Sequence, residues 1–221
     1  IKLIQLAIES ASIQSQKDGK IYKDWEGINL LVSAGATIED IDSARYISNR
    51  SSGKMGILLA QAAKFRGANV DFVHGQLQAE KELIEGLNNF QTRNAKEMLE
   101  MLEMLQPTAN AIAMTAAIAD IRVKIDSASN KIGKEQLYET LKDRLEIVPD
   151  LLKELVSKKH ESQIILGFTA LSGSAAEIKH IALTKKKEKG CDLLFANPID
   201  IENQGFESDF NSGWLIQSDE T

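Results

Sequence analysis

At 221 residues, with 43% hydrophobic and 26% charged side chains, the chain has enough material for one large domain, or two small ones, with a real core. The net charge of −6 argues against a nucleic-acid-binding surface, because phosphate backbones require a clustered excess of lysine and arginine. The only cysteine, Cys191, rules out an internal disulfide, no apolar run approaches the roughly 20 residues of a membrane span, and no secretory signal is visible, so we expect a cytoplasmic protein with no membrane partner.

The first 26 residues differ in character from the rest of the chain. Residues 1–13 space their apolar side chains as an amphipathic helix does, and residues 14–26 are polar and predict a linker. The sequence starts at Ile1 rather than at methionine, and we expect it to be cut from a longer chain. This predicts a helix and linker over residues 1–26 and one domain over residues 27–221.

From residue 28 onward, short apolar runs alternate with runs of helical periodicity. The predicted strands are residues 28–37, 68–75, 88–93, 110–120, 163–170 and 191–198. The predicted helices are residues 53–67, 80–87, 95–105, 149–156 and 175–190. This alternation is typical of parallel crossover units, so the sequence predicts an α/β fold with a Rossmann-like, mostly parallel open sheet and helices on both faces.

Two segments do not follow the alternation. Residues 121–143 are polar, basic and contain a glycine, and they are too long for a routine connection. We therefore expect a functional flap there and call it the basic flap. Residues 204–219 alternate apolar and polar side chains around Asn211–Gly213, which predicts a final hairpin.

The stretch ISNRSSGKMG, residues 47–56, lies where a strand gives way to a helix. Free N–H groups and the helix dipole attract anions there, glycine allows close approach, and Ser51 and Ser52 can donate hydrogen bonds. A P-loop is excluded, because Ser48 and Met55 stand where the motif needs glycine and serine or threonine. From composition alone, the stretch is either an anion-binding turn or an N-cap serine with a solvated lysine.

Other charged side chains are candidates for the same site. Asp120 follows a run of small residues at a strand end, where it could hold a ribose hydroxyl or a metal-bound phosphate, or simply cap a turn. Lys131 and Lys134 in the basic flap could neutralise phosphate charge or remain solvated. Lys185 and Lys189, four residues apart, share one helix face and could reach a nucleotide or favour the helix C-terminus.

Histidine and cysteine chemistry finds little support in the sequence. His74, His160 and His180 do not have the spacing of a zinc site, and Cys191 beside a buried strand is typical of a structural thiol. Tyr138 and Lys142 have the Y-x-x-x-K spacing of short-chain dehydrogenases. This spacing often arises by chance, the glycine-rich dinucleotide turn is missing, and we expect a helix surface there.

Several stretches together resemble one family, that of phosphopantothenate–cysteine ligase, also called phosphopantothenoylcysteine synthetase. The match spans about residues 28–218, with SNRSSGKMG as its most specific block. It runs through residues 33–56, 115–122, 130–134, 167–170, 192–197 and 204–211 in the family order. The resemblance implies a ligase that joins 4'-phosphopantothenate to L-cysteine in coenzyme A biosynthesis, through an acyl-cytidylate made from CTP with Mg²⁺.

The resemblance also implies roles for individual residues. By position, Asn49 matches the asparagine that helps turn over the acyl-nucleotide, and Lys131 matches the flap lysine that acts in forming it. No residue is assigned as a metal ligand by this match. The nucleotide-binding residues implied are Asp120, Phe168, Lys185 and Lys189, and Ala116 and Ala117 are expected to lie against the substrate. From their place at the start of a helix, we expect Ser51, Ser52 and Gly53 to contact phosphate.

The family further implies a homodimer and, in bacteria, a covalently linked flavin-dependent decarboxylase half. Residues 1–26 would then be the junction with that half. The sequence departs from the family pattern at several positions, among them Gly133, Val148 and Leu171. Two alternatives therefore remain beside the ligase: an NAD(P)-dependent oxidoreductase built on Tyr138 and Lys142, and a non-catalytic nucleotide-binding module.

Overall fold

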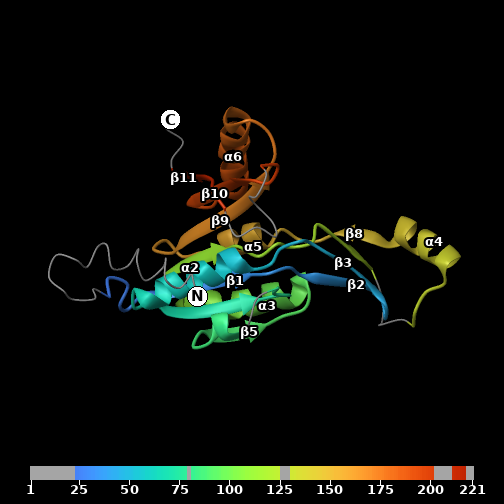
Figure 1. Ribbon diagram of the computed structural model, residues 1–221, viewed down its shortest axis with the longest axis horizontal. Coiled ribbons are helices and arrows are strands. Elements are labelled where there is room, and N and C mark those ends of the chain that lie inside the picture. The colour runs from blue at the N-terminus through green and yellow to red at the C-terminus, as the bar shows by residue number, and fades with distance from the viewer. Residues whose placement is uncertain (1–22, 79–80, 125–129, 202–210, 218–221) are drawn as a thin grey trace.

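The structure, a computed structural model, describes residues 23–78, 81–124, 130–201 and 211–217 (Figure 1). Its centre is a seven-stranded sheet in which neighbouring strands are parallel, except at one edge, where β11 runs antiparallel to β10. The strands, in spatial order, are β11 (Trp214–Ile216), β10 (Leu193–Pro198), β9 (Ile164–Leu171), β6 (Ala111–Met114), β1 (Asn29–Ala34), β4 (Asn69–His74) and β5 (Asn88–Gln91). The predicted α/β open sheet is therefore confirmed.

Helices cover both faces of the sheet, as the sequence predicts. On one face, α2 (Lys54–Phe65) buries Ile57 and Ala60 against β1 and β4. The larger core lies on the opposite face, under α3 (Ala95–Leu105), α5 (Leu151–Lys158) and α6 (Ala175–Lys189). Short 3₁₀ turns are η1 (Lys81–Ile84) and η2 (Gln106–Thr108), so the helix expected over residues 80–87 is only a single turn in its described part.

Three of the described helices begin with a side-chain cap. Asn94 and Asp150 accept hydrogen bonds from backbone N–H groups three residues ahead and begin α3 and α5. Ser174 and Glu177 form a reciprocal capping box at the start of α6. Gly190 ends α6 in the left-handed conformation, where a residue without Cβ is favoured. None of the helices among the described residues is long and apolar enough to cross a membrane.

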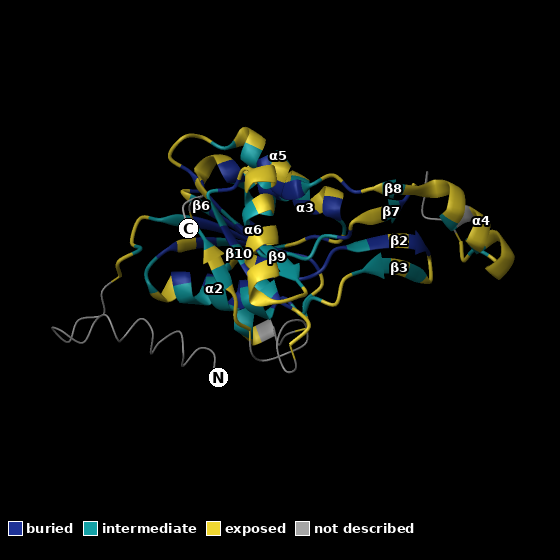
Figure 2. Cartoon of the chain, turned by 90° about the horizontal axis from the view of Figure 1, so that it is seen from above, coloured by how far each residue is buried: buried dark blue, intermediate teal, exposed yellow. Residues whose placement is uncertain are grey.

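An arm projects from the sheet, at the right of Figures 1 and 2. It consists of two antiparallel hairpins that pack through β2 and β7, together with one helix. Its elements are β2 (Ile38–Asp42), β3 (Arg45–Ser48), β7 (Ile121–Val123), β8 (Leu145–Ile147) and α4 (Lys134–Arg144). The segment expected to be the basic flap, residues 121–143, contains β7 and most of α4, and β2–β3 was not predicted.

The base of the arm is fixed to the start of α3. Glu39 accepts a hydrogen bond from the Ala95 backbone N–H at 2.8 Å, and Arg93 pairs with Asp40. Burial raises the pKa of Glu39, because a charged carboxylate is poorly solvated there. These long-range contacts explain why acidic residues can form a largely buried strand.

The structure tests the predictions for the two ends of the chain only in part. The helix expected over residues 1–13, and most of the linker, lie outside the described residues. In the tail, β11 does form an antiparallel pair, but its partner is β10. The segment expected to be the first strand of the final hairpin lies largely outside the described residues, so its pairing with β11 stays a prediction.

Candidate functional site

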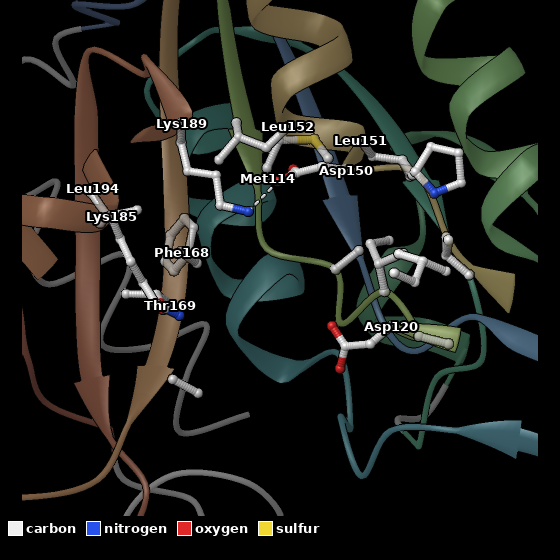
Figure 3. Close-up of a pocket in the computed structure, with 17 residues that line it drawn as sticks. Met114, Asp120, Asp150, Leu151, Leu152, Phe168, Thr169, Lys185, Lys189 and Leu194 are labelled. Atoms are coloured by element: carbon white, nitrogen blue, oxygen red, sulfur yellow. Dashed lines mark hydrogen bonds and ion pairs between the residues drawn. The ribbon is translucent and has the colours of Figure 1, made fainter. Parts of the chain in front are cut away.

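A hollow of about 560 Å³ opens at the carboxyl ends of β6 and β9 (Figure 3). β1 and β6 are the neighbours at which the strand order reverses, since β4 and β5 follow on one side and β9 and β10 on the other. Ligands of open α/β sheets bind in the crevice at such a switch point. The residues lining the hollow that matter below are Ala116, Ile118, Asp120, Asp150, Phe168, Thr169, Lys185 and Lys189.

One wall of the hollow is positively charged. Lys185 and Lys189 lie one turn apart on α6, and both reach toward the hollow from the same side. The Lys185 Nζ donates to Thr169 Oγ1 at 3.3 Å, and Lys189 forms an ion pair with Asp150 at the start of α5. Phe168 lies between these lysines and the opposite wall (Figure 3). Such an arrangement suits a flat ring beside an anionic group.

The opposite wall is formed by the loop after β6, which ends at Asp120. The carboxylate of Asp120 is exposed toward the hollow, while its backbone carbonyl accepts a hydrogen bond from the Val148 N–H at 2.9 Å. The loop is tied to the end of β1 as well, because Ala117 N–H donates to Gly35 O at 2.8 Å. Asp120 is therefore a solvated carboxylate on a rigid loop.

Asn49 joins this loop from the end of β3. Its side-chain amide donates to the carbonyl of Ile118 at 2.9 Å, and Ile118 lines the hollow. Ser48 supports the same turn by donating to Thr37 O at 2.8 Å. Asn49 thus lies at the rim of the hollow, close to the Asp120 loop.

The turn between β3 and α2 follows directly. The hydroxyls of Ser51 and Ser52 lie 3.4 Å from the N–H groups of Gly53 and Lys54. Gly53 has φ of 80°, and a Cβ there would overlap the side chain of Leu77 and lie 3.3 Å from the backbone of Gly35. The first turn of α2 therefore lies against the end of β1, as an anion site at a helix N-terminus requires.

Comparisons with known proteins identify the family of the chain. The family model described as "DNA/pantothenate metabolism flavoprotein C-terminal domain" matches residues 25–221. The chain belongs to this family.

The most informative relatives of this family carry the name "Coenzyme A biosynthesis bifunctional protein CoaBC". The protein from Mycobacterium tuberculosis (strain ATCC 25618 / H37Rv) is 36% identical over 222 residues, which cover 96% of this chain and 51% of the relative. The one from Bacillus subtilis (strain 168) is 35% identical over 187 residues, or 84% of this chain and 44% of the relative. The chain thus spans about half the length of these curated relatives.

A solved structure in the same family has the same fold. The crystal structure of the C-terminal domain of a CoaBC protein is 30% identical, has a TM-score of 0.65, and covers 79% of each chain. The family resemblance found in the sequence is therefore confirmed.

The family positions fall into two groups in the structure. Asn49, Ala116, Asp120 and the residues of the positive wall gather around one hollow. Ser51–Gly53 do not line it and precede α2, where Gly53 lies against Gly35 and Leu77. The backbone N–H and C=O of Ala117 instead bond to Gly35 and Thr37, which ties the loop to β1. Lys131 does not line the hollow, because it lies in the arm just ahead of α4. Within a single chain, the flap lysine is therefore separated from the rest of the site.

Some residues of the site were not found from the sequence. Asp150 lies in the helix predicted over residues 149–156, and its pairing with Lys189 was not foreseen. Thr169 lies in the stretch 167–170 that resembles the family, but its bond to Lys185 depends on the register of α6 over β9. An N-cap aspartate directly after a proline was the available signal for Asp150.

Tyr138 and Lys142, the pair considered for a dehydrogenase, both lie on α4 in the arm. Tyr138 is 68% exposed, and neither residue lines the hollow. The structure therefore places this pair on a helix surface, as we expected.

Proposed function

We propose that this chain catalyses the joining of 4'-phosphopantothenate to L-cysteine with CTP, giving phosphopantothenoylcysteine, CMP and pyrophosphate in coenzyme A biosynthesis. The observation that carries the proposal is the single hollow in which Asp120 faces Lys185 and Lys189, with Asn49 at its rim. The names of the relatives in coenzyme A biosynthesis support the pathway. We propose a cytoplasmic location as well, in keeping with relatives named for coenzyme A biosynthesis.

In the first step, an oxygen of the substrate carboxylate attacks the α-phosphorus of CTP, and pyrophosphate leaves. The obstacle is electrostatic, because an anion must approach a strongly anionic triphosphate. Lys185 and Lys189 supply positive charge beside Phe168, and the N-terminus of α2 supplies N–H donors for a phosphate. In this proposal, Lys131 contributes further positive charge at the reacting phosphate.

In the second step, the cysteine amine attacks the acyl carbon. The new C–N bond forms as the bond between the acyl carbon and the CMP oxygen breaks. Asn49 is held at the rim by its bond to Ile118 O. In this proposal its amide polarises the acyl carbonyl, and an amide suits this role because it does not titrate.

The donor set of the hollow fits Mg²⁺ held together with a nucleotide. Among the described residues, no three His, Cys, Asp or Glu side chains gather to hold a metal by themselves. Mg²⁺ commonly keeps several waters and uses one or two carboxylates plus substrate phosphates, and Asp120 offers such a carboxylate. When bound there, Mg²⁺ would supply charge neutralisation at the triphosphate.

We propose that two copies of the chain assemble through the arm and complete the site. Support comes from large apolar side chains exposed on the arm, including Ile147, at 83%, and Tyr138. The separation of Lys131 from the hollow supports this as well, because a second copy could supply its lysine. We further propose that residues 1–26 connect to a flavin-dependent decarboxylase half in the full-length protein, in keeping with relatives of twice the length.

The direct test is a pyrophosphate-release assay with 4'-phosphopantothenate, L-cysteine, Mg²⁺ and either CTP or ATP. We expect release that requires phosphopantothenate and is faster with CTP. A folded sample that binds CTP without turnover would instead identify a non-catalytic nucleotide-binding module. A sample that neither binds nor consumes CTP would contradict the proposal altogether.

A further inference from the structure

Asp42 lies at the turn of the β2–β3 hairpin with its side chain fully enclosed. Its Oδ1 closes the turn by accepting from the N–H groups of Ala44 at 2.8 Å and Arg45 at 2.9 Å. Its Oδ2 has different partners. It accepts from Arg45 Nε at 3.1 Å, Arg45 Nη2 at 2.6 Å, and the backbone N–H of Ile132 at 3.1 Å.

Arg45 completes the contact with Ile132. Its Nη2 donates to the Ile132 carbonyl at 2.7 Å, so both backbone polar groups of Ile132 bind one side-chain ion pair 87 to 90 residues away in sequence. We call this arrangement the Asp42–Arg45 clamp. Hydrogen bonds to charged groups are stronger than neutral ones, and the enclosed carboxylate is screened from water.

The clamped segment has little other support. Asn130, Lys131 and Gly133 are exposed, and a Cβ built on Gly133 would meet no atom within 4 Å. Among the described residues, Ile132 is the half-buried member of this segment, and the clamp holds its backbone. Lys131 is the residue directly before Ile132.

We propose that Asp42 and Arg45 are positioning residues that hold the backbone at Ile132 and so aim Lys131 at the reacting phosphate. This inference rests on the proposed ligase function for the role of Lys131, but the clamp itself does not. A lysine on an untethered loop spends most of its time away from a bound phosphate, and misplacement by about 1 Å can cost on the order of a hundredfold in rate. The clamp acts in the same way whether Lys131 serves its own chain or a second copy.

Asp42→Asn separates the two roles of this carboxylate, which are to close the hairpin turn and to hold the backbone of Ile132. An asparagine oxygen can still accept from Ala44 and Arg45 and close the turn. Its amide group cannot accept from Ile132 or attract Arg45. Asp40→Asn is the matched control, because Asp40 lies on the same strand and also pairs with an arginine, Arg93, but does not contact Ile132.

The first experiment measures backbone hydrogen exchange in the full chain without substrates. We expect Asp42→Asn to speed exchange of the Ile132 amide by about tenfold or more, since that amide loses a charged acceptor. Arg45→Gln should speed it less, and Asp40→Asn should leave it unchanged. Unchanged exchange at Ile132 in a folded Asp42→Asn variant would overturn the clamp, whatever reaction the protein performs.

The second experiment measures pyrophosphate release in a single turnover without cysteine. We expect Asp42→Asn to slow this step by about ten- to a hundredfold, while the CTP concentration that gives half the maximal rate stays nearly constant. In a Lys131→Gln background, Asp42→Asn should cause no further loss, because it acts through that lysine. Independent, multiplying losses in the double variant would overturn the positioning role and leave only a structural clamp. An inactive wild type would count against the proposed function, while the exchange result would still decide the clamp.

Discussion

Asp150 caps helix α5 with one carboxylate oxygen and forms an ion pair with Lys189 of α6 through the other. The pair joins two helices at the mouth of the hollow and places a negative charge beside a positive one. A bound triphosphate would be attracted by Lys189 and repelled by Asp150.

Asp150→Asn should therefore tighten CTP binding. Asparagine retains the cap, whereas the repulsion disappears, and removing one nearby charge in solvent is worth about twofold per phosphate charge. Isothermal titration with CTP and Mg²⁺ measures this. Asp192→Asn is the control, because Asp192 pairs with Lys159 and does not line the hollow. Weaker binding in Asp150→Asn would mean that the pair mainly orients Lys189.

Asn49→Ala should separate the two chemical steps. We expect it to consume CTP and accumulate the acyl-cytidylate, because the second step loses a hydrogen-bond donor at the acyl group and slows by about a hundred- to a thousandfold. Mass spectrometry of the quenched reaction detects the intermediate. Equal slowing of both steps would argue that Asn49 only supports the loop through Ile118.

Mixing two inactive variants tests whether Lys131 acts on a second copy. In hybrids of Lys131→Gln and Asp120→Asn chains, one of two sites would combine intact residues, and random pairing in a two-fold dimer would restore roughly a quarter of wild-type activity. The measurement is turnover after co-expression or joint refolding. If activity does not return although hybrids form, Lys131 must act within its own chain.

Gly53→Ala should destabilise the protein more than Gly27→Ala. Both glycines have φ near 80°, so both variants carry the cost of left-handed backbone, about 1 kcal/mol each. At Gly27 a Cβ meets nothing within 4 Å, whereas at Gly53 it overlaps Leu77. We expect an additional loss of about 1–3 kcal/mol at Gly53, measured by urea denaturation. Similar losses in both variants would show that Leu77 moves aside freely.

Glu39→Gln should change stability in a pH-dependent way. Burial raises the pKa of Glu39, so its contribution is favourable below its unfolded value and is lost as the pH rises through the folded value. Glutamine keeps the oxygen that accepts from Ala95 and stays neutral. The variant should be more stable than wild type at pH 7 and equal to it near pH 4. Chemical denaturation at both pH values measures this, and a variant less stable at pH 7 would contradict it.

The main sheet could be predicted because the periodicity of apolar residues indicates which side chains are buried in a core. The runs that became β1, α2 and β9 bury their side chains against immediate sheet neighbours, so local pattern and final environment agree. The hollow could be placed for a similar reason, since strand ends in an open sheet share one edge.

The arm could not be predicted from local pattern. In β2, Glu39 and Asp42 are buried beside Ile41, and their partners, Ala95, Arg45 and Ile132, become neighbours only through the tertiary structure. The same holds for Lys131, which is eleven residues after Asp120 in sequence. So short a distance in sequence suggests that Lys131 lies close to Asp120 in space. However, β7 leads the chain away from the hollow before Lys131 is reached.

The outermost strands of the main sheet are short, with three residues in β11 and four in β5, and β5 begins with Asn88 and Asn89. Short border strands offer few unpaired backbone groups to another molecule, and the asparagines of β5 add polar side chains at that edge. The sheet therefore has little capacity to add strands from neighbouring molecules, which should limit fibre-like aggregation in a crowded solution.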